Sequence, residues 1–222
     1  MKNKIIMLLL FSLSFIFASS GMFYGHGSYV GGAYHSDENT DSDGDDFTTT
    51  SYGASAGFFV NPNVEVYIEG SLYDDIYADS YYSDYNRNGT QFLLGGAYHY
   101  RNALDMDGNS LNLRFGAEYS TITIDGEWLG DIEASGTDTA LNIGGYFKTQ
   151  LAGFNVIPFM IYASHNMTIT LSYEGDTLEE NEKTKTTTIG MGVDLGRYVI
   201  SPIMHLYEGG DTAFVLAASM AI

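Results

Sequence analysis

Apolar and polar residues alternate along several stretches of the chain, and this alternation predicts β-strands. In Leu111 to Asp125, apolar residues at odd-numbered positions alternate with polar or small residues up to Ser120. Successive side chains of a strand point to opposite faces, so this segment has one apolar face and one polar face. The other predicted strands are Met22–His35, Thr49–Val60, Val64–Tyr73, Thr90–Arg101, Thr139–Gln150, Phe154–Leu171, Lys185–Leu195, Tyr198–Tyr207 and Ala213–Ile222.

Short and long connectors alternate between these strands. The short turns are predicted at Asn61–Asn63, Asn102–Ser110, Leu151–Asn155 and Gly196–Tyr198. The long polar loops are predicted at Ser36–Thr48, Asp74–Gly89, Gly126–Asp138, Ser172–Thr184 and Glu208–Thr212. Outer-membrane barrels have short periplasmic turns, long external loops and an even strand number. The pattern therefore predicts an all-β, antiparallel, up-and-down transmembrane β-barrel of about ten strands, with eight strands as the alternative.

A secreted soluble β-sandwich is the competing interpretation, since it also has many short alternating strands. Its loops need not sort into a long class and a short class, so the connectors favour the barrel. The first 20 residues predict export: two lysines precede an apolar run from Ile5 to Phe17, and small residues follow at Ala18 to Ser20. We therefore expect a signal peptide over residues 1–20 and a single barrel domain over residues 21–222.

On these dyad strands and alternating connectors, the chain resembles the small outer-membrane β-barrel proteins of Gram-negative bacteria. This class includes opacity-type adhesins and OmpA-like or OmpX-like barrels. The last predicted strand keeps the alternation but ends on Ile222, where such proteins usually carry an aromatic residue. The resemblance implies a monomer in the cell outer membrane, reached through the periplasm and surrounded by lipid and lipopolysaccharide.

The amino-acid composition excludes some classes of binding partner. The formal net charge is −19 at pH 7, which argues against binding nucleic acid, because phosphates would repel the protein. Cysteine is absent, so neither a disulfide bond nor a thiolate metal site can form. We expect no cofactor and no resident metal.

If the apolar faces meet lipid, the polar faces enclose the barrel lumen. The predicted luminal charge cluster consists of Glu65, Glu69, Arg101, Arg114, Glu118, Lys148 and Asp194, with His99 beside it. Opposite charges on neighbouring strands could neutralise one another as a structural plug. They could also exchange partners and gate a narrow, cation-preferring ion path. A barrel of about eight to ten strands is nearly filled by side chains, so bulk diffusion of nutrients is not expected.

The predicted loops carry two candidate surfaces. The acidic run from Asp37 to Asp46 resembles the front half of a calcium loop, but Thr50 stands where a bidentate Glu belongs. It indicates a solvated acidic loop, with divalent-cation binding as the alternative. Aromatic residues of the second and third loops could recognise an extracellular protein or glycan, or could form the interfacial belt of the barrel. They are Tyr77, Tyr81, Tyr82, Tyr85 and Trp128.

Three histidines, His35, His165 and His205, are expected near the outer rim, where barrel enzymes place their active sites. None lies in an Asp-x-His or His-x-Ser arrangement, so the sequence does not require catalysis. The sequence favours a structural or surface-interaction protein that is not an enzyme. A narrow cation channel is the first alternative, and a rim-active hydrolase is the second.

Overall fold

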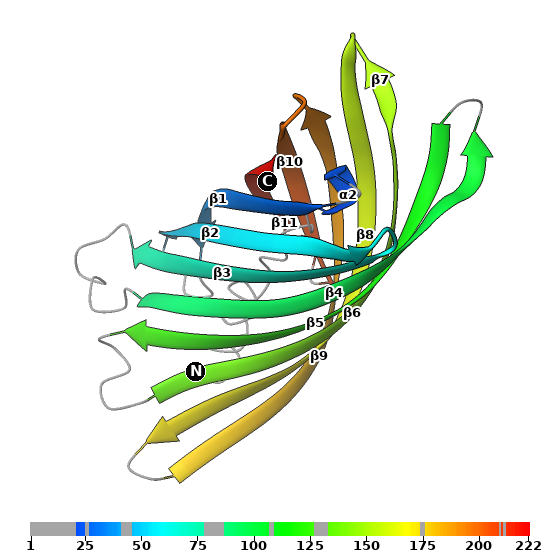
Figure 1. Ribbon diagram of the computed structural model, residues 1–222. Helices are drawn as coiled ribbons and strands as arrows, with labels where there is room; N and C mark the ends of the chain where they lie inside the picture. The colour runs from blue at the N-terminus through cyan, green and yellow to red at the C-terminus, as the bar shows by residue number, and fades with distance from the viewer. Residues whose placement is uncertain are drawn as a thin grey trace.

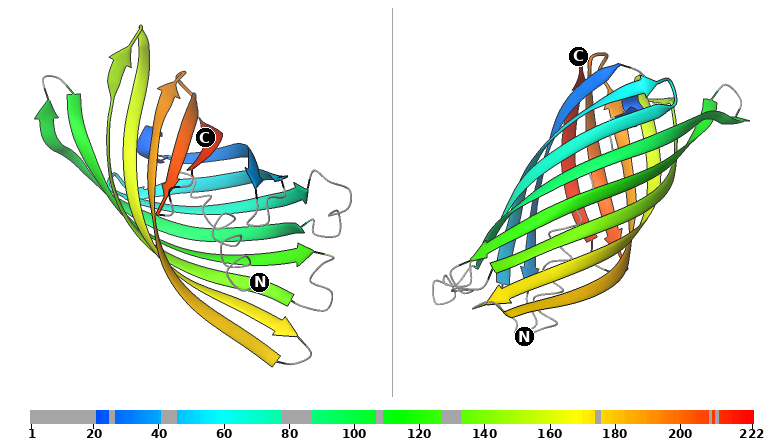
Figure 2. Two further views of the ribbon diagram at one scale, coloured as in Figure 1. Left: turned by 180° about the vertical axis from the view of Figure 1, so that it is seen from behind. Right: turned by 60° about the horizontal axis from the view of Figure 1, so that its bottom comes forward.

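The computed structural model of the chain is a closed antiparallel β-barrel of ten strands (Figures 1 and 2). It describes residues 21–24, 27–40, 46–77, 87–106, 109–126, 133–173, 176–208, 210 and 212–222. Within these ranges, no helix is long and apolar enough to cross a membrane. The predicted signal peptide lies outside the described residues, so it stays a prediction.

The elements follow the order of the predicted strands. They are α2 (Gly21–Tyr24), β1 (Ser28–Thr40), β2 (Asp46–Asn61), β3 (Val64–Tyr77), β4 (Arg87–Met106), β5 (Asn109–Gly126), β6 (Glu133–Phe147), β7 (Thr149–Leu151), β8 (Phe154–Tyr173), β9 (Asp176–Asp194), β10 (Tyr198–Tyr207) and β11 (Thr212–Ala221). Both β6 and β7 pair with β8, and they are separated only by Lys148, so together they form one strand of the barrel.

The barrel closes because the first strand pairs with the last. Tyr29 lies opposite Ala221 and His35 lies opposite Val215 in the β1–β11 ladder. Every other strand pairs with its neighbour in sequence, with β6 and β7 counted as one strand. A closed barrel leaves no strand edge with unpaired backbone groups, which is the condition for spanning lipid with strands.

The two faces of the wall have the polarity that the alternation predicted. On β5, Phe115 and Tyr119 are exposed on the outside, whereas Arg114 and Glu118 are buried inside. Outward-facing apolar residues recur around the barrel, for example Leu72 on β3, Phe92 on β4 and Leu141 on β6. This exposed apolar belt with a polar interior is the arrangement of a barrel whose outer face meets lipid.

We call the end of the barrel with the short turns at Pro62–Asn63, Ala152–Gly153 and Gly196–Arg197 the turn end. The opposite end is the loop end. Both β1 and β11 place the chain termini of the barrel at the turn end, since Ile222 donates a backbone hydrogen bond to Ser28.

Two predicted connectors are largely strand. The predicted turn Asn102–Ser110 is wrong, because β4 continues to Met106 and β5 begins at Asn109, with an irregular register after Tyr100. The predicted loop Ser172–Thr184 is also wrong, because β8 ends at Tyr173 and β9 begins at Asp176. The polar residues there do not alternate with apolar ones, yet the backbone ladder forms, with Leu171 opposite Leu178. A side-chain hydrogen bond of 2.7 Å from Thr168 to Asn181 joins the same two strands.

The helical turn α2 packs inside the turn end of the barrel. Its residues Met22 and Phe23 are buried in one apolar cluster with Tyr146, Phe159 and Val199 of the wall. The ring of Phe23 approaches Gly192 so closely that a Cβ atom there would lie 2.7 Å from it. Figure 2 shows α2, in dark blue, at the same end of the barrel as the C-terminus. The sequence assigned Met22 to a strand, and this part of the prediction is wrong.

Candidate functional site

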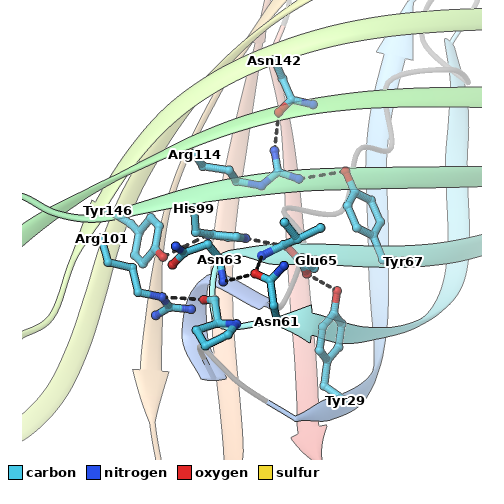
Figure 3. A network of polar contacts seen from close by, with 12 residues as sticks. Tyr29, Asn61, Asn63, Glu65, Tyr67, His99, Arg101, Arg114, Asn142 and Tyr146 are labelled. Carbon is cyan, nitrogen blue, oxygen red and sulfur yellow. Dashed lines mark hydrogen bonds and ion pairs between the residues drawn. The ribbon is translucent and has the colours of Figure 1, made fainter.

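A network of buried polar side chains crosses the lumen near the turn end (Figure 3). Its first link is Tyr29 on β1, whose hydroxyl group donates a hydrogen bond to Glu65 on β3. The ring crosses β2 at Gly57, which lies opposite Tyr29, and a Cβ atom at that glycine would overlap the ring. The absence of a side chain at Gly57 therefore lets Tyr29 reach past its neighbouring strand.

The second link repeats this geometry two strands further on. Tyr67 on β3 lies opposite Gly95 on β4, and Gly95 lies opposite Glu118 on β5. The Tyr67 ring covers Gly95, and its hydroxyl group donates a hydrogen bond to Oε1 of Glu118. Each Tyr–Gly–Glu bridge thus joins three strands, and aromatic cover of strand glycines is a known means of fixing register in sheets.

Arg114 connects the second bridge to β6. Its guanidinium donates one hydrogen bond to the Tyr67 hydroxyl at 2.8 Å and another to the side-chain oxygen of Asn142. Figure 3 shows Arg114 between these two residues. Asn142 in turn donates to Glu118 at 3.0 Å, and Arg114 and Glu118 form an ion pair at 3.8 Å. Because Arg114 is only 1% exposed, these partners are what stabilises its buried charge.

His99 closes the network on its other side. One ring nitrogen lies 2.9 Å from Glu65, and the other lies 3.0 Å from the hydroxyl group of Tyr146. His99 and Glu65 are both completely buried. The bonded side chains therefore run from β1 through β3, β4 and β5 to β6, which is half of the barrel wall.

Four of the seven residues of the predicted luminal charge cluster are buried inside the barrel. They are Glu65, Glu69, Arg114 and Glu118. The other three members, Arg101, Lys148 and Asp194, lie toward the turn end, and their place in a luminal cluster stays a prediction. Arg101 bonds the carbonyl oxygen of Pro62 at 2.8 Å and covers the ring of Phe59.

Lys148 is exposed at the break between β6 and β7. Asp194 caps a turn, because its carboxylate accepts a hydrogen bond from the backbone of Gly196 at 2.8 Å. A carboxylate that accepts a backbone hydrogen bond two residues further on is common in turns.

The predicted recognition surface cannot be placed from the structure. Tyr81, Tyr82, Tyr85 and Trp128 lie outside the described residues. Tyr77 is the last residue of β3, at the loop end of the barrel. Most of the predicted calcium loop, Asp41 to Asp45, also lies outside the described residues. Recognition and divalent-cation binding by the loops stay predictions.

The three histidines expected at the rim are buried inside the barrel. His35 bonds the carbonyl oxygen of Phe214 at 2.6 Å, and His205 bonds Thr188 at 2.9 Å. His165 lies 2.7 Å from Asp138, a partner that no short motif could reveal because it is 27 positions away in sequence. Asp138 lies on β6, which pairs with β8, so the barrel brings the two together.

Sequence reasoning missed the neutral members of the network. Tyr29, Tyr67, Asn142 and Tyr146 carry no charge, yet they make most of its hydrogen bonds. A signal existed: each bridging tyrosine faces inward opposite a glycine of the next strand. Using it requires the strand register, which the lengths of the turns fix and the alternation alone does not.

The side chains of the network bond one another. Within the described ranges, no group of three or more His, Asp or Glu side chains could hold a metal ion. The carboxylates of Glu65 and Glu118 are instead held by phenol, imidazole, amide and guanidinium groups.

Comparison with known proteins supports the fold alone. No protein-family model and no curated protein sequence matches the chain. The β domain of the Bordetella autotransporter BrkA aligns with 89% of this chain and 100% of its own, with a TM-score of 0.55 and 10% identity. The translocator domain of the autotransporter NalP from Neisseria meningitidis aligns with 100% and 97% of the two chains, with a TM-score of 0.49 and 10% identity. Neisserial surface protein A aligns with 88% and 97%, with a TM-score of 0.39 and 15% identity.

The chain has the fold of an outer-membrane β-barrel. The ten-strand closed sheet and the apolar outer belt are the features that it shares with this architecture. Identities of 10% to 15% carry no information about ligands or activity, so function has to come from the site.

Proposed function

We propose that this protein is a structural or surface-interaction barrel of the bacterial outer membrane, closed to the flow of solutes at its turn end. The observation that carries this proposal is the buried network from Tyr29 to Tyr146, together with α2 packed beside it. In this account the turn end faces the periplasm and the loop end faces the outside, as in outer-membrane barrels generally.

Two layers close the turn end. The apolar layer is formed by Met22 and Phe23 of α2 against the wall. Tyr24 adds a polar contact, since its hydroxyl group lies 3.0 Å from that of Ser219 on β11. The polar layer is the network, in which Glu65, Arg114 and Glu118 each take part in two of the hydrogen bonds described above. Opening a path there would separate charges that are already desolvated, which is costly.

The loop end offers the surface for interaction. Here β8 and β9 continue as a paired hairpin over Thr168–Tyr173 and Asp176–Asn181. Glu179 and Glu180 on its second strand make this hairpin acidic, as the sequence predicted for the external face. Contact with anionic lipopolysaccharide would require divalent cations as bridges, and an extracellular protein or glycan is the alternative partner.

Liposome swelling tests the closed lumen. We expect vesicles containing the refolded mature chain to stay impermeable to small sugars. Phe23→Ala weakens the apolar layer but leaves the polar layer in place, so vesicles with this variant should not swell either. Fractionation of the native host should recover the protein with the outer membrane. Swelling of vesicles with the unchanged chain, or recovery in the soluble fraction, would contradict the proposal.

The narrow cation path remains the second candidate. It is favoured by one observation, the excess of carboxylates over guanidinium groups among the buried side chains of the lumen. The absence of enzymatic activity stays a prediction. Asp138 and His165 form a pair that could act as a general base if a substrate bound beside it.

A further inference from the structure

Polar groups without partners gather in the lumen on the loop-end side of the network. Four side-chain atoms there have no hydrogen-bond partner among the described residues: Oε1 of Gln91, Oε2 of Glu118, Oδ1 of Asp138 and Nε2 of His165. Each of these side chains is at most 6% exposed. A buried polar atom without a partner costs free energy, so a ligand that bonds all four would be favoured.

The register brings the four groups to one part of the wall. Ser120 on β5 is its centre, since it lies opposite Asp138 on β6 and accepts a hydrogen bond from Gln91 at 3.4 Å. Glu118 is two positions from Ser120 on the same face, and His165 bonds Asp138. Directly opposite and diagonal positions of neighbouring strands lie roughly 5 to 8 Å apart, so one small ligand can contact several of them.

All four atoms can act as acceptors. The oxygen atoms of Gln91, Glu118 and Asp138 carry lone pairs. When the His165 ring carries its hydrogen on Nδ1 alone, that N–H donates to Asp138 and Nε2 keeps a lone pair. A ligand for this set must therefore donate hydrogen bonds in several directions.

The two carboxylates of this set favour a positive ligand. Glu118 pairs with the guanidinium of Arg114, and Asp138 has His165 as its neighbour. Arg114 also donates hydrogen bonds to Tyr67 and Asn142, so its charge is bound up in the network. Uncompensated charge inside a barrel is costly, so a cation at this place would stabilise the folded protein.

We propose that a small cation bearing several N–H groups, of the primary-ammonium class, binds in the lumen between Gln91, Glu118, Asp138 and His165. A bare metal ion fits less well, because its ligands must converge at about 2.0 to 2.6 Å, and the described residues contain no such group of three. N–H donors reach acceptors about 2.7 to 3.2 Å away and in separate directions, which suits a spread-out set. The cation enters from the loop end, because the network and α2 close the other end.

The test uses the mature chain refolded in detergent micelles, with methylammonium chloride as the probe. Calorimetric titration and the ¹⁵N resonances of the His165 ring should show saturable binding. Tetramethylammonium chloride at the same ionic strength has equal charge but no N–H group, and it should not bind. Glu118→Gln and Asp138→Asn should each weaken methylammonium binding by about tenfold or more, because a charge-assisted hydrogen bond is lost.

Glu208→Gln is the matched control, since Glu208 pairs with Lys185 on the exposed surface and should leave binding unchanged. If the charge variants do not refold, Gln91→Leu carries the test, because the bond to Ser120 is the one side-chain bond that Gln91 makes within the described part of the chain. Equal effects of the two ammonium salts would overturn the proposal, as would tighter binding of Mg²⁺ than of methylammonium. Finding His99 and His165 doubly protonated with no binding of methylammonium would overturn it as well, since protons would then supply the missing charge.

Discussion

The ring of Tyr67 lies over Gly95 and fills the space that any larger side chain at position 95 would need. From there its hydroxyl group bonds Glu118 on the far side of β4. The same relationship holds between Tyr29 and Gly57, so a glycine on one strand decides whether the strands on either side of it are bridged. The network therefore depends on Gly57 and Gly95, which contribute no side chain to it but leave room for the tyrosine rings.

Gly95→Ala should displace the Tyr67 ring and break its bond to Glu118. We expect the free energy of unfolding to fall by about 1 to 3 kcal/mol, the usual cost of overpacking. Gly96→Ala is the control, because a Cβ atom there would meet only the backbone oxygen of Glu65, at 3.5 Å. Urea unfolding of the refolded protein in micelles measures both. Equal loss of stability in the two variants would show that the ring does not depend on Gly95.

Tyr29→Phe keeps the ring over Gly57 but removes the hydroxyl group that bonds Glu65. One buried carboxylate oxygen then loses a donor, which should cost about 1 to 3 kcal/mol. Tyr34→Phe lies on the same strand and removes a hydroxyl group from the exposed outer face, so it should cost much less. A comparison of the two unfolding midpoints decides the matter, and similar midpoints would place Tyr29 outside the network.

Alternation along the strands was enough to predict the strand count, the closed barrel and the inward direction of Glu65, Arg114 and Glu118. It failed where the chain forms a helical turn, as at Met22, and where strands continue without an apolar face, as from Asp176 onward. It also gave no reason to single out Tyr29 or Asn142, because a neutral side chain is recognised as part of a charge network only once the register brings it beside a charge.

Glu118→Ala should destabilise the barrel more than the tyrosine variant does. It leaves Arg114 buried without its ion-pair partner and removes the acceptor of both Tyr67 and Asn142. We expect a cost of roughly 3 to 5 kcal/mol where the site stays dry, and less where water enters. Leu141→Ala, on the outward face, tests the loss of apolar contact alone. A Glu118 variant no weaker than the Leu141 variant would show that the ion pair contributes nothing.

The direction of the barrel across the membrane can be tested with inserted tags. A tag at Glu180, in the β8–β9 hairpin, should bind antibody on intact cells, because the loop end faces outward. A tag at Gly153, in the turn between β7 and β8, should bind antibody only after the outer membrane is permeabilised. The reverse pattern of labelling would mean that the turn end faces outward.

Single-channel recording of the refolded mature chain in a planar bilayer tests the closed lumen most directly. The network and α2 together predict a silent membrane over the whole range of applied voltage, in salts of small and of large cations alike. Discrete current steps from the unchanged protein would contradict the account, because ions would then be passing the buried side chains that it describes as a plug.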